Sequence, residues 1–124
     1  MAIYHCSVKC ITRSEGRSAV AAAAYRSGEK LTNCYDGVTH DYTKKRWILH
    51  QEIMLPEQAP VSYKDRSELW NAVEMAERSS SCRLAREVQV ALPLELTMEE
   101  NIALVQQYVQ KNFVRQGMCA DIAI

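Results

Sequence analysis

A run of four alanines, Ala21 to Ala24, constrains the fold of this chain more than any other feature. Alanine is the strongest helix former among the amino acids. Ser18 stands before the run as a helix N-cap, and Gly28 follows it as a stop signal. The pattern therefore predicts a helix from Ala19 to about Ser27. Because alanine adds no side-chain bulk, this helix can lie very close to a sheet or to a large partner.

Several other segments have the pattern of β-strands. Residues 3–11 alternate with a period of two, which predicts a strand with one well-buried face. Tyr4, Cys6, Val8 and Cys10 share one face, and Ile3, His5, Ser7, Lys9 and Ile11 share the other. Further strands are predicted over Ile48–Leu55, Leu84–Leu92 and Met118–Ile124. Pro56 and Pro93 end the first two of these. Asp36-Gly37 predicts a tight turn.

Two more helices complete the pattern. One is predicted over Arg66–Glu77, with an inner side formed by Leu69, Trp70, Val73 and Ala76. The other opens at the capping box Thr97-x-x-Glu100 and ends at Gly117, with an apolar stripe formed by Ile102, Val105, Tyr108, Val109 and Phe113. The order β-α-β-α-β-α-β within 124 residues predicts one α+β domain, with a sheet covered by helices on one side.

Composition indicates a cytoplasmic protein. No apolar run approaches the roughly 18 residues that a membrane span requires, and the N-terminus lacks the pattern of a signal peptide. The five cysteines are too widely spaced for a zinc cluster or a disulfide framework. We expect Cys6 and Cys10 to pack as small apolar side chains, with a reactive or metal-binding role as the alternative.

The net charge is zero, but its distribution is uneven. Residues 1–50 carry eight basic and four acidic side chains, a net +4, so the remaining chain carries −4. This asymmetry would let the N-terminal part meet phosphate groups, although a mixed solvated surface explains it equally well. His5, His40 and His50 are scattered without the spacing of metal ligands, and we expect them to be surface or packed side chains.

Tyr25 is the candidate nucleophile. It lies near the C-terminal end of the alanine-rich helix, next to Arg26 and about two turns after Arg17. A phenol is a weak nucleophile at neutral pH because its pKa is about 10. A neighbouring cation or metal can stabilise the phenolate and the charge that develops on an attacked phosphate. In the alternative, Tyr25 packs its ring against the sheet with its hydroxyl in water.

Several short segments of this chain form a specific combination. They are Met1–Lys9, Gly16–Ala19 with Ala21–Arg26, Tyr35–Gly37, Asp41-Tyr42, Leu69–Asn71, Leu84–Glu87, Val90–Pro93 and Gly117–Asp121. Together they closely resemble the N-terminus of MobA/MobL-type relaxases, and the resemblance covers essentially the whole chain. These relaxases are plasmid-mobilisation nucleases that include the relaxase parts of TraA-like proteins.

The resemblance implies a fold and a reaction. The family fold is an antiparallel central sheet flanked by helices, as in HUH relaxases. The tyrosine that matches Tyr25 attacks a phosphodiester at a transfer origin and becomes joined to the 5′ end of the strand. A divalent metal, Mn²⁺ or Mg²⁺, held by a histidine cluster polarises the phosphate. Accessory mobilisation proteins and a coupling ATPase are implied as partners.

The chain departs from the family at the metal site. The family motif, a histidine followed by an Asn-Pro-His-x-His segment, comes directly after the stretch that matches Ala120–Ile124. We therefore expect residues 1–124 to be the N-terminal part of a relaxase domain, truncated before the histidine motif. Such a chain is expected to bind no metal tightly and not to nick DNA at a useful rate alone. Glu87 is a candidate metal-binding or active-site carboxylate, with an exposed strand carboxylate as the alternative.

Single-stranded DNA is the expected partner. The basic residues expected to contact it are Arg13, Arg17, Arg26 and Lys30 near Tyr25, and Lys44, Lys45 and Arg46 beside Trp47. Basic residues beside an aromatic ring suit single strands, because the phosphates are neutralised while the bases stack. For Lys44–Arg46 the alternative is a solvated loop.

Two alternatives stay open for the chain as a whole. One is a non-catalytic remnant that grips single-stranded DNA, with salt-dependent binding and indifference to metal. The other is self-association through an unpaired strand edge at Met118–Ile124.

Overall fold

The computed structural model describes residues 5–124 and orders their elements as β-α-β-β-β-α-β-α-β. The strands and helices are β1 (Cys6–Thr12), α1 (Ala19–Ser27), β2 (Lys30–Thr32), β3 (Thr39–Asp41), β4 (Gln51–Met54), α2 (Arg66–Ala76), β5 (Arg83–Val90), α3 (Met98–Asn112) and β6 (Ala120–Ala123). Beyond the predicted order, β2 and β3 form a hairpin around the predicted Asp36-Gly37 turn. Among residues 5–124, each helix is too short or too polar to span a membrane.

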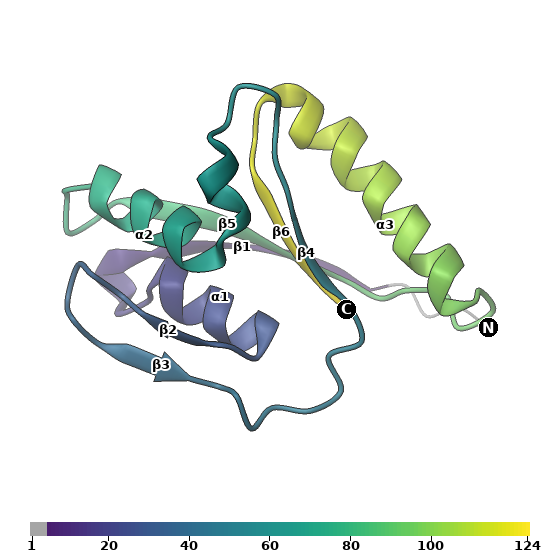
Figure 1. Cartoon of the computed structure of the whole chain (residues 1–124), viewed down its shortest axis with the longest axis horizontal. Helices are drawn as coiled ribbons and strands as arrows, with labels where there is room; N and C mark the ends of the chain where they lie inside the picture. Colours follow the sequence, from purple (N-terminus) through teal and green to yellow (C-terminus); the bar gives the residue numbers. More distant parts are fainter. Residues whose placement is uncertain (1–4) are drawn as a thin grey trace.

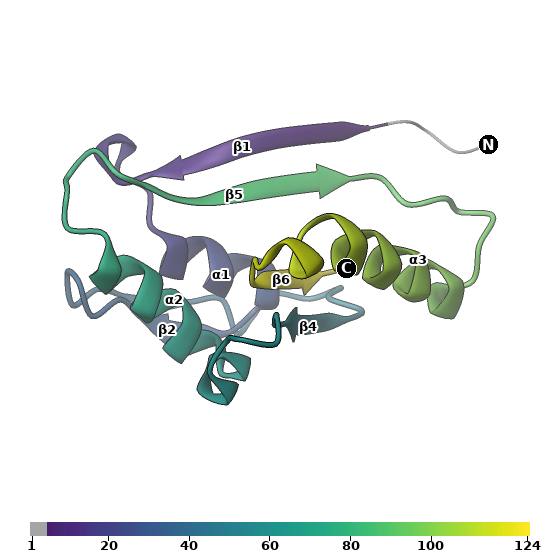
Figure 2. The ribbon, with the colours of Figure 1, turned by 90° about the horizontal axis from the view of Figure 1, so that it is seen from above.

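The strands pair antiparallel as β1–β5, β2–β3 and β4–β6. In the β1–β5 ribbon, Cys6 lies opposite Val90 and Ile11 opposite Ala85. Figure 2 shows this ribbon as one long layer, with α1 and α2 on one side of it. The predicted α+β class with antiparallel pairing is confirmed. Within the described residues, however, the strands form separate two-stranded sheets rather than one continuous central sheet.

Helix α1 forms where its caps predict it. Ser18 Oγ accepts a 3.1 Å hydrogen bond from the amide of Ala21. Gly28 adopts a left-handed backbone conformation, with a φ of 70°, and its amide donates back to the last turn of the helix. Glycine takes this conformation without steric cost, so the helix ends at Ser27 as predicted.

Helix α1 lies between α2 and the β2–β3 hairpin (Figure 1) and buries its small side chains on two sides. Val20 and Ala24 are fully buried and pack in one cluster with Leu31 of β2. Ala19 packs in another with Ile11 of β1. The smooth surface of the helix thus lets strands approach from both sides. A separate core cluster joins α3 to β6 and consists of Val109, Val114 and Ile122.

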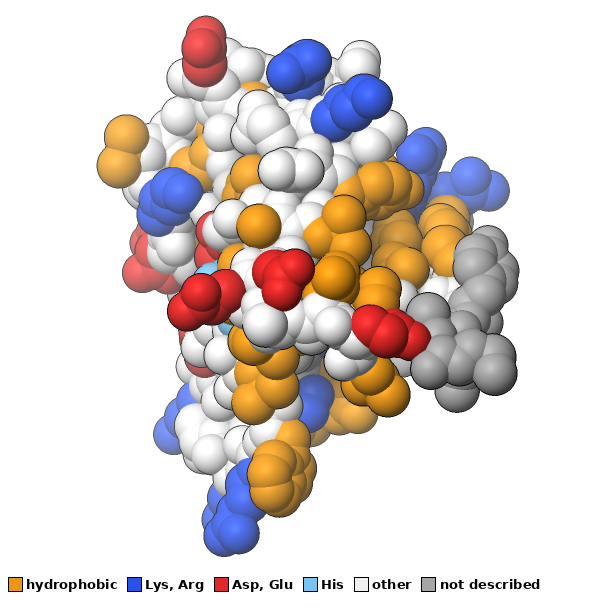
Figure 3. Space-filling view, turned by 90° about the vertical axis from the view of Figure 1, so that its right-hand side faces the viewer, with side chains coloured by type: hydrophobic (Ala, Val, Ile, Leu, Met, Phe, Trp, Pro, Cys, Tyr) orange, Lys and Arg blue, Asp and Glu red, His pale blue; other side chains and the backbone are white. Residues whose placement is uncertain are grey.

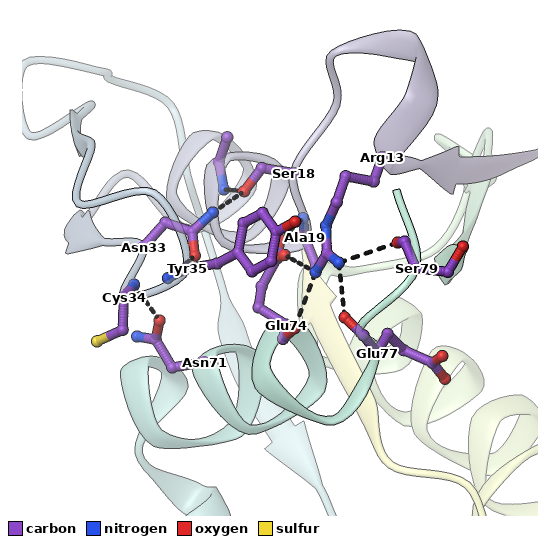
Figure 4. Close-up of polar contacts among 11 residues, drawn as sticks. Arg13, Ser18, Ala19, Asn33, Cys34, Tyr35, Asn71, Glu74, Glu77 and Ser79 are labelled. Carbon is purple, nitrogen blue, oxygen red and sulfur yellow. Dashed lines mark hydrogen bonds and ion pairs between the residues drawn. The ribbon is translucent and has the colours of Figure 1, made fainter. Parts of the chain in front are cut away.

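A buried carboxylate fixes the start of α1 (Figure 4). Glu74 of α2 is 1% exposed and accepts a 2.7 Å hydrogen bond from the amide of Ala19. Its other oxygen accepts a 2.8 Å hydrogen bond from Arg13, whose remaining contacts include the carbonyls of Glu77 and Ser79. Helix N-termini carry unpaired amides and favour negative charge. Glu74 therefore provides an acceptor for an amide at the start of α1 and also neutralises the charge of Arg13.

The face of β1 that carries Cys6 and Cys10, which we expected to pack, is exposed. Cys6 and Cys10 are exposed, Val8 is 62% exposed, and Tyr4 lies outside the described residues. The opposite face carries Ile11, which is 4% exposed and packs against α1. Alternation shows that two faces differ, but it does not show which face the helices cover. The predicted packing of Cys6 and Cys10 as small apolar side chains is therefore wrong.

Two further expectations change in the structure. The apolar stripe predicted for α3 includes Tyr108, but its side chain is 52% exposed and meets the ring of Phe113 edge to face. Met118–Ile124 was expected to present an unpaired edge. Strand β6 within this segment pairs with β4, so one of its two edges is engaged, and self-association through the other stays a prediction.

Replacing Glu74 by alanine is expected to lower the free energy of unfolding by about 3–5 kcal/mol, because Arg13 then stays buried without its carboxylate. Glu68→Ala, at an exposed position in the first turn of the same helix, is the matched control and should lower that energy by at most about 1 kcal/mol, the value of its interaction with the helix dipole. Urea denaturation followed by circular dichroism measures both. Equally small effects of the two substitutions would contradict the anchoring role.

Candidate functional site

The side chain of Tyr25 projects from the last turn of α1 and is 45% exposed. Its ring meets the ring of Tyr42 edge to face, with 5.3 Å between the ring centroids. Tyr42 belongs to the segment that follows β3, so this segment folds back onto the C-terminal end of α1. About half of the phenol remains open to a ligand.

Two cationic side chains lie against the Tyr25 ring. The ammonium of Lys45 is 3.6 Å from the ring centroid and donates a 2.7 Å hydrogen bond to the Tyr25 carbonyl. The guanidinium carbon of Arg26 is 5.4 Å from the same centroid. Cation–π attraction stabilises both contacts, and Lys45 also satisfies one of the unpaired carbonyls at the helix end. A phosphate that approached this phenol would meet two positive charges.

Glu87 connects this group to β5. Its Oε1 accepts a 2.8 Å hydrogen bond from Arg26, and the two side chains are both partly exposed. The carboxylate holds the guanidinium beside Tyr25 and offsets part of the positive charge there. Because the pair is partly solvated, its contribution to stability is small.

A cleft of about 330 Å³ opens beside Arg26 and Glu87. Strands β5 and β6 line it, and within the described residues each pairs with a neighbour on one side only. Helix α1 lines it with Ala19, Ala22 and Ala23. Since these side chains are so small, the cleft reaches close to the helix backbone.

Asp121 of β6 is a cleft residue that the sequence did not single out. Its two oxygens accept hydrogen bonds of 2.7 and 2.8 Å from Arg66, and one also accepts a 2.8 Å bond from the indole of Trp70. Burial would lower the pKa of Arg66, but the hydrogen bonds and charges of Asp121 and Glu29 raise it above its ordinary value. The only sequence signal was a lone carboxylate in an apolar strand, 55 residues from its partner.

The basic residues that were predicted to contact DNA have different surroundings in the structure. Arg26 and Lys45 lie at the candidate nucleophile. Arg17 donates a 3.1 Å hydrogen bond to a backbone carbonyl of β1. Arg13 has its guanidinium hydrogen-bonded to Glu74 and to backbone carbonyls, so it has a structural role, and its contact with DNA stays a prediction. The exposed members of the set are Lys30, Lys44 and Arg46.

The donors among the described residues do not fit the histidine-held metal site that the resemblance implies. His5 is exposed beside β1, His40 lies on β3, and His50 Nε2 is 3.0 Å from Glu52 Oε1. Within residues 5–124, no three His, Cys, Asp or Glu side chains are grouped so that they could hold one ion. We therefore assign no chemical step to a metal held by these residues.

Comparison with known proteins relates this geometry to transfer proteins. The model of the MobA/MobL family matches residues 17–124. The chain is 45% identical to the mobilization protein MobL of Acidithiobacillus ferridurans, over 100% of this chain and 32% of that protein. It is 43% identical to the conjugal transfer protein TraA of Agrobacterium fabrum (strain C58), over 98% of this chain and 12% of that protein.

The fold also matches a solved structure from work on the molecular basis of vancomycin resistance transfer in Staphylococcus aureus. The TM-score is 0.93 and the identity 32%, over 99% of this chain and 62% of that one. The chain therefore spans less than two-thirds of the length of each of these three proteins.

Asp121→Ala is expected to lower the free energy of unfolding by about 1.5–3 kcal/mol, because Arg66 and the indole of Trp70 lose a shared acceptor while Glu29 still pairs with Arg66. In a Trp47→Phe background, Trp70 is the remaining tryptophan, and the wavelength of its emission should change as its indole loses its acceptor. Glu57→Ala, at an exposed loop position, is the control. Unchanged emission together with unchanged stability would show that this ion pair does not hold the cleft.

Proposed function

The chain belongs to the MobA/MobL family, and we propose that it forms the N-terminal part of a relaxase domain that binds single-stranded DNA at a plasmid transfer origin. In this proposal, Tyr25 is the nucleophile. The observation that carries it is a half-exposed phenol flanked by Lys45 and Arg26. Because the chain spans only part of its mobilisation and conjugal transfer relatives, the reaction of a whole protein belongs to the proposal as well.

The proposed reaction is a transesterification. The Tyr25 oxygen attacks the phosphorus of one phosphodiester, so a bond from Oη to phosphorus forms and the bond from phosphorus to the 3′ oxygen breaks. The phenol releases its proton, and the leaving 3′ oxygen takes up a proton to become a hydroxyl. The 5′-phosphotyrosyl adduct retains the energy of the ester, so the 3′ hydroxyl can reverse the step. Lys45 and Arg26 offset the negative charge that develops on the phosphate oxygens.

Glu87 has a positioning role in this proposal. Its hydrogen bond to Arg26 restrains a long side chain that would otherwise sample many rotamers in solvent. Restraint of the guanidinium beside the phenol favours a productive placement of the phosphate.

DNA binding without cutting is the second candidate function. The family reaction requires a divalent metal, Mn²⁺ or Mg²⁺, and the described residues group no donors for one. The cations proposed to meet the strand, in contrast, lie together at the end of α1. We therefore expect the 124-residue chain to bind a single strand without nicking it at a useful rate. Accessory mobilisation proteins and a coupling ATPase would belong to the complete transfer complex.

A labelled single-stranded transfer-origin oligonucleotide, incubated with the chain and Mn²⁺ or Mg²⁺, tests both functions. We expect binding in fluorescence anisotropy and no covalent adduct on a denaturing gel. Tyr25→Phe removes only the phenol oxygen and should bind equally well. An adduct that vanishes in Tyr25→Phe would establish cutting and overturn the binding-only alternative. Failure of the wild-type chain to bind any single strand would overturn the proposed function itself.

Lys45→Ala and Lys111→Ala form a matched pair that tests where the strand binds. Each removes one positive charge, but Lys45 contacts Tyr25, whereas Lys111 is exposed on α3. We expect Lys45→Ala to weaken binding and to reduce the slope of log affinity against log salt by about 0.7, the value for one phosphate contact. Lys111→Ala should leave both quantities unchanged. Equal losses in the two variants would indicate an unspecific charge effect.

A further inference from the structure

Trp47 combines two unfavourable features. Its side chain is 89% exposed, the largest fraction among the large apolar residues that the structure describes. Its φ is 71°, and no other non-glycine residue within 5–124 has a positive φ. This conformation is uncommon for a bulky side chain, and such outliers gather at functional sites. With so much of the indole open to solvent, burial within the chain does little to offset the strain.

The backbone on both sides of Trp47 is held against α1. Before it, the side chain of Lys45 donates a 2.7 Å hydrogen bond to the carbonyl of Tyr25. After it, Ile48 packs so closely on Gly28, the C-terminal cap of α1, that a Cβ atom there would clash with its Cδ1 atom. The segment that carries the indole is therefore held on both sides to the C-terminal end of α1, where Tyr25 lies.

Positive charge accompanies the indole. Lys44, Lys45 and Arg46 directly precede it, and Lys44 and Arg46 are exposed. The segment between β3 and β4 forms the lower end of the molecule in Figure 1, where Figure 3 shows basic side chains next to hydrophobic ones. An aromatic ring among cations is the arrangement that binds unpaired nucleotides, because the cations meet phosphates while the ring stacks on a base.

We propose that Trp47 is a base-stacking residue whose indole stacks on an unpaired base of the strand that places a phosphate at Tyr25. The inference rests on the proposed function. It adds that stacking of one base on Trp47 fixes which phosphate of the DNA strand lies at Tyr25. Trp47 follows Lys45 by two residues, at most about 7 Å along the backbone, so one short strand can reach both. Stacking needs a base with a free face, which favours single strands over duplex without selecting a sequence.

A fluorescence titration with oligothymidine of about 12 nucleotides, within the site sizes of single-strand binders, tests the stacking. Trp47 and Trp70 are the two tryptophans of the chain, and the indole of Trp70 is bonded to Asp121. We expect the strand to quench the emission of the wild-type chain and not that of Trp47→Phe. An abasic strand of the same length should bind more weakly and not quench. Equal quenching by the abasic strand would overturn the stacking.

Trp47→Gly separates binding from folding. Glycine accepts the φ of 71° without strain, so the stability of the variant to urea should be equal or higher. Its affinity for dye-labelled oligothymidine, measured by anisotropy, should fall about 5- to 100-fold. Leu94→Ala, at an apolar position that is 88% exposed, is the control and should change neither quantity.

The possible results distinguish the two proposals. Undiminished affinity of Trp47→Gly, with normal binding by the wild-type chain, would overturn the stacking and leave the proposed function standing. Failure of the wild-type chain to bind oligothymidine, abasic and origin strands alike would overturn both. Equal losses of affinity for a single strand and for its duplex would also refute the stacking.

Discussion

The placement of α1 depends on one buried interaction, the carboxylate of Glu74 between Arg13 and the amide of Ala19. Arg13 follows β1 and Glu74 belongs to α2, so this contact joins the long ribbon and two helices at one point. Its importance comes from the cost of losing either partner, which would leave a buried charge or an unpaired donor. Because α1 is short and regular, fixing its first residue also fixes where its last turn presents Tyr25.

The site at the other end of α1 shows that the position of a charge matters more than its presence. Arg13 is neutralised inside the protein, whereas Arg26 remains partly exposed and is restrained by Glu87. Lys45 comes from a different segment and places its ammonium on the Tyr25 ring. The positive charge near the phenol is thus assembled from two segments, since Lys45 lies 20 residues after Tyr25 in the sequence.

Local signals allowed the capped elements to be predicted, since Ser18 and Gly28 define α1 and the Thr97 capping box opens α3. The covered face of β1 could not be predicted in the same way, because alternation is symmetric between faces. The ion pair of Arg66 and Asp121 joins residues 55 apart and leaves no local pattern. The left-handed backbone conformation of Trp47 could not be predicted either, because tryptophan has no preference for that region. The roles of Tyr25 and Glu87 came from the resemblance and stay predictions.

The alanine surface of α1 has an entropic consequence for its surroundings. Alanine has no side-chain rotamers to lose, so packing this helix between strands costs no side-chain conformational entropy at those positions. The longer side chains at this end of the molecule are those of Tyr25, Arg26 and Lys45, and contacts with each other and with Glu87 already hold them in the folded chain. A bound strand would therefore meet side chains that are partly ordered. Part of the entropic cost of recognition is thus incurred on folding rather than on binding.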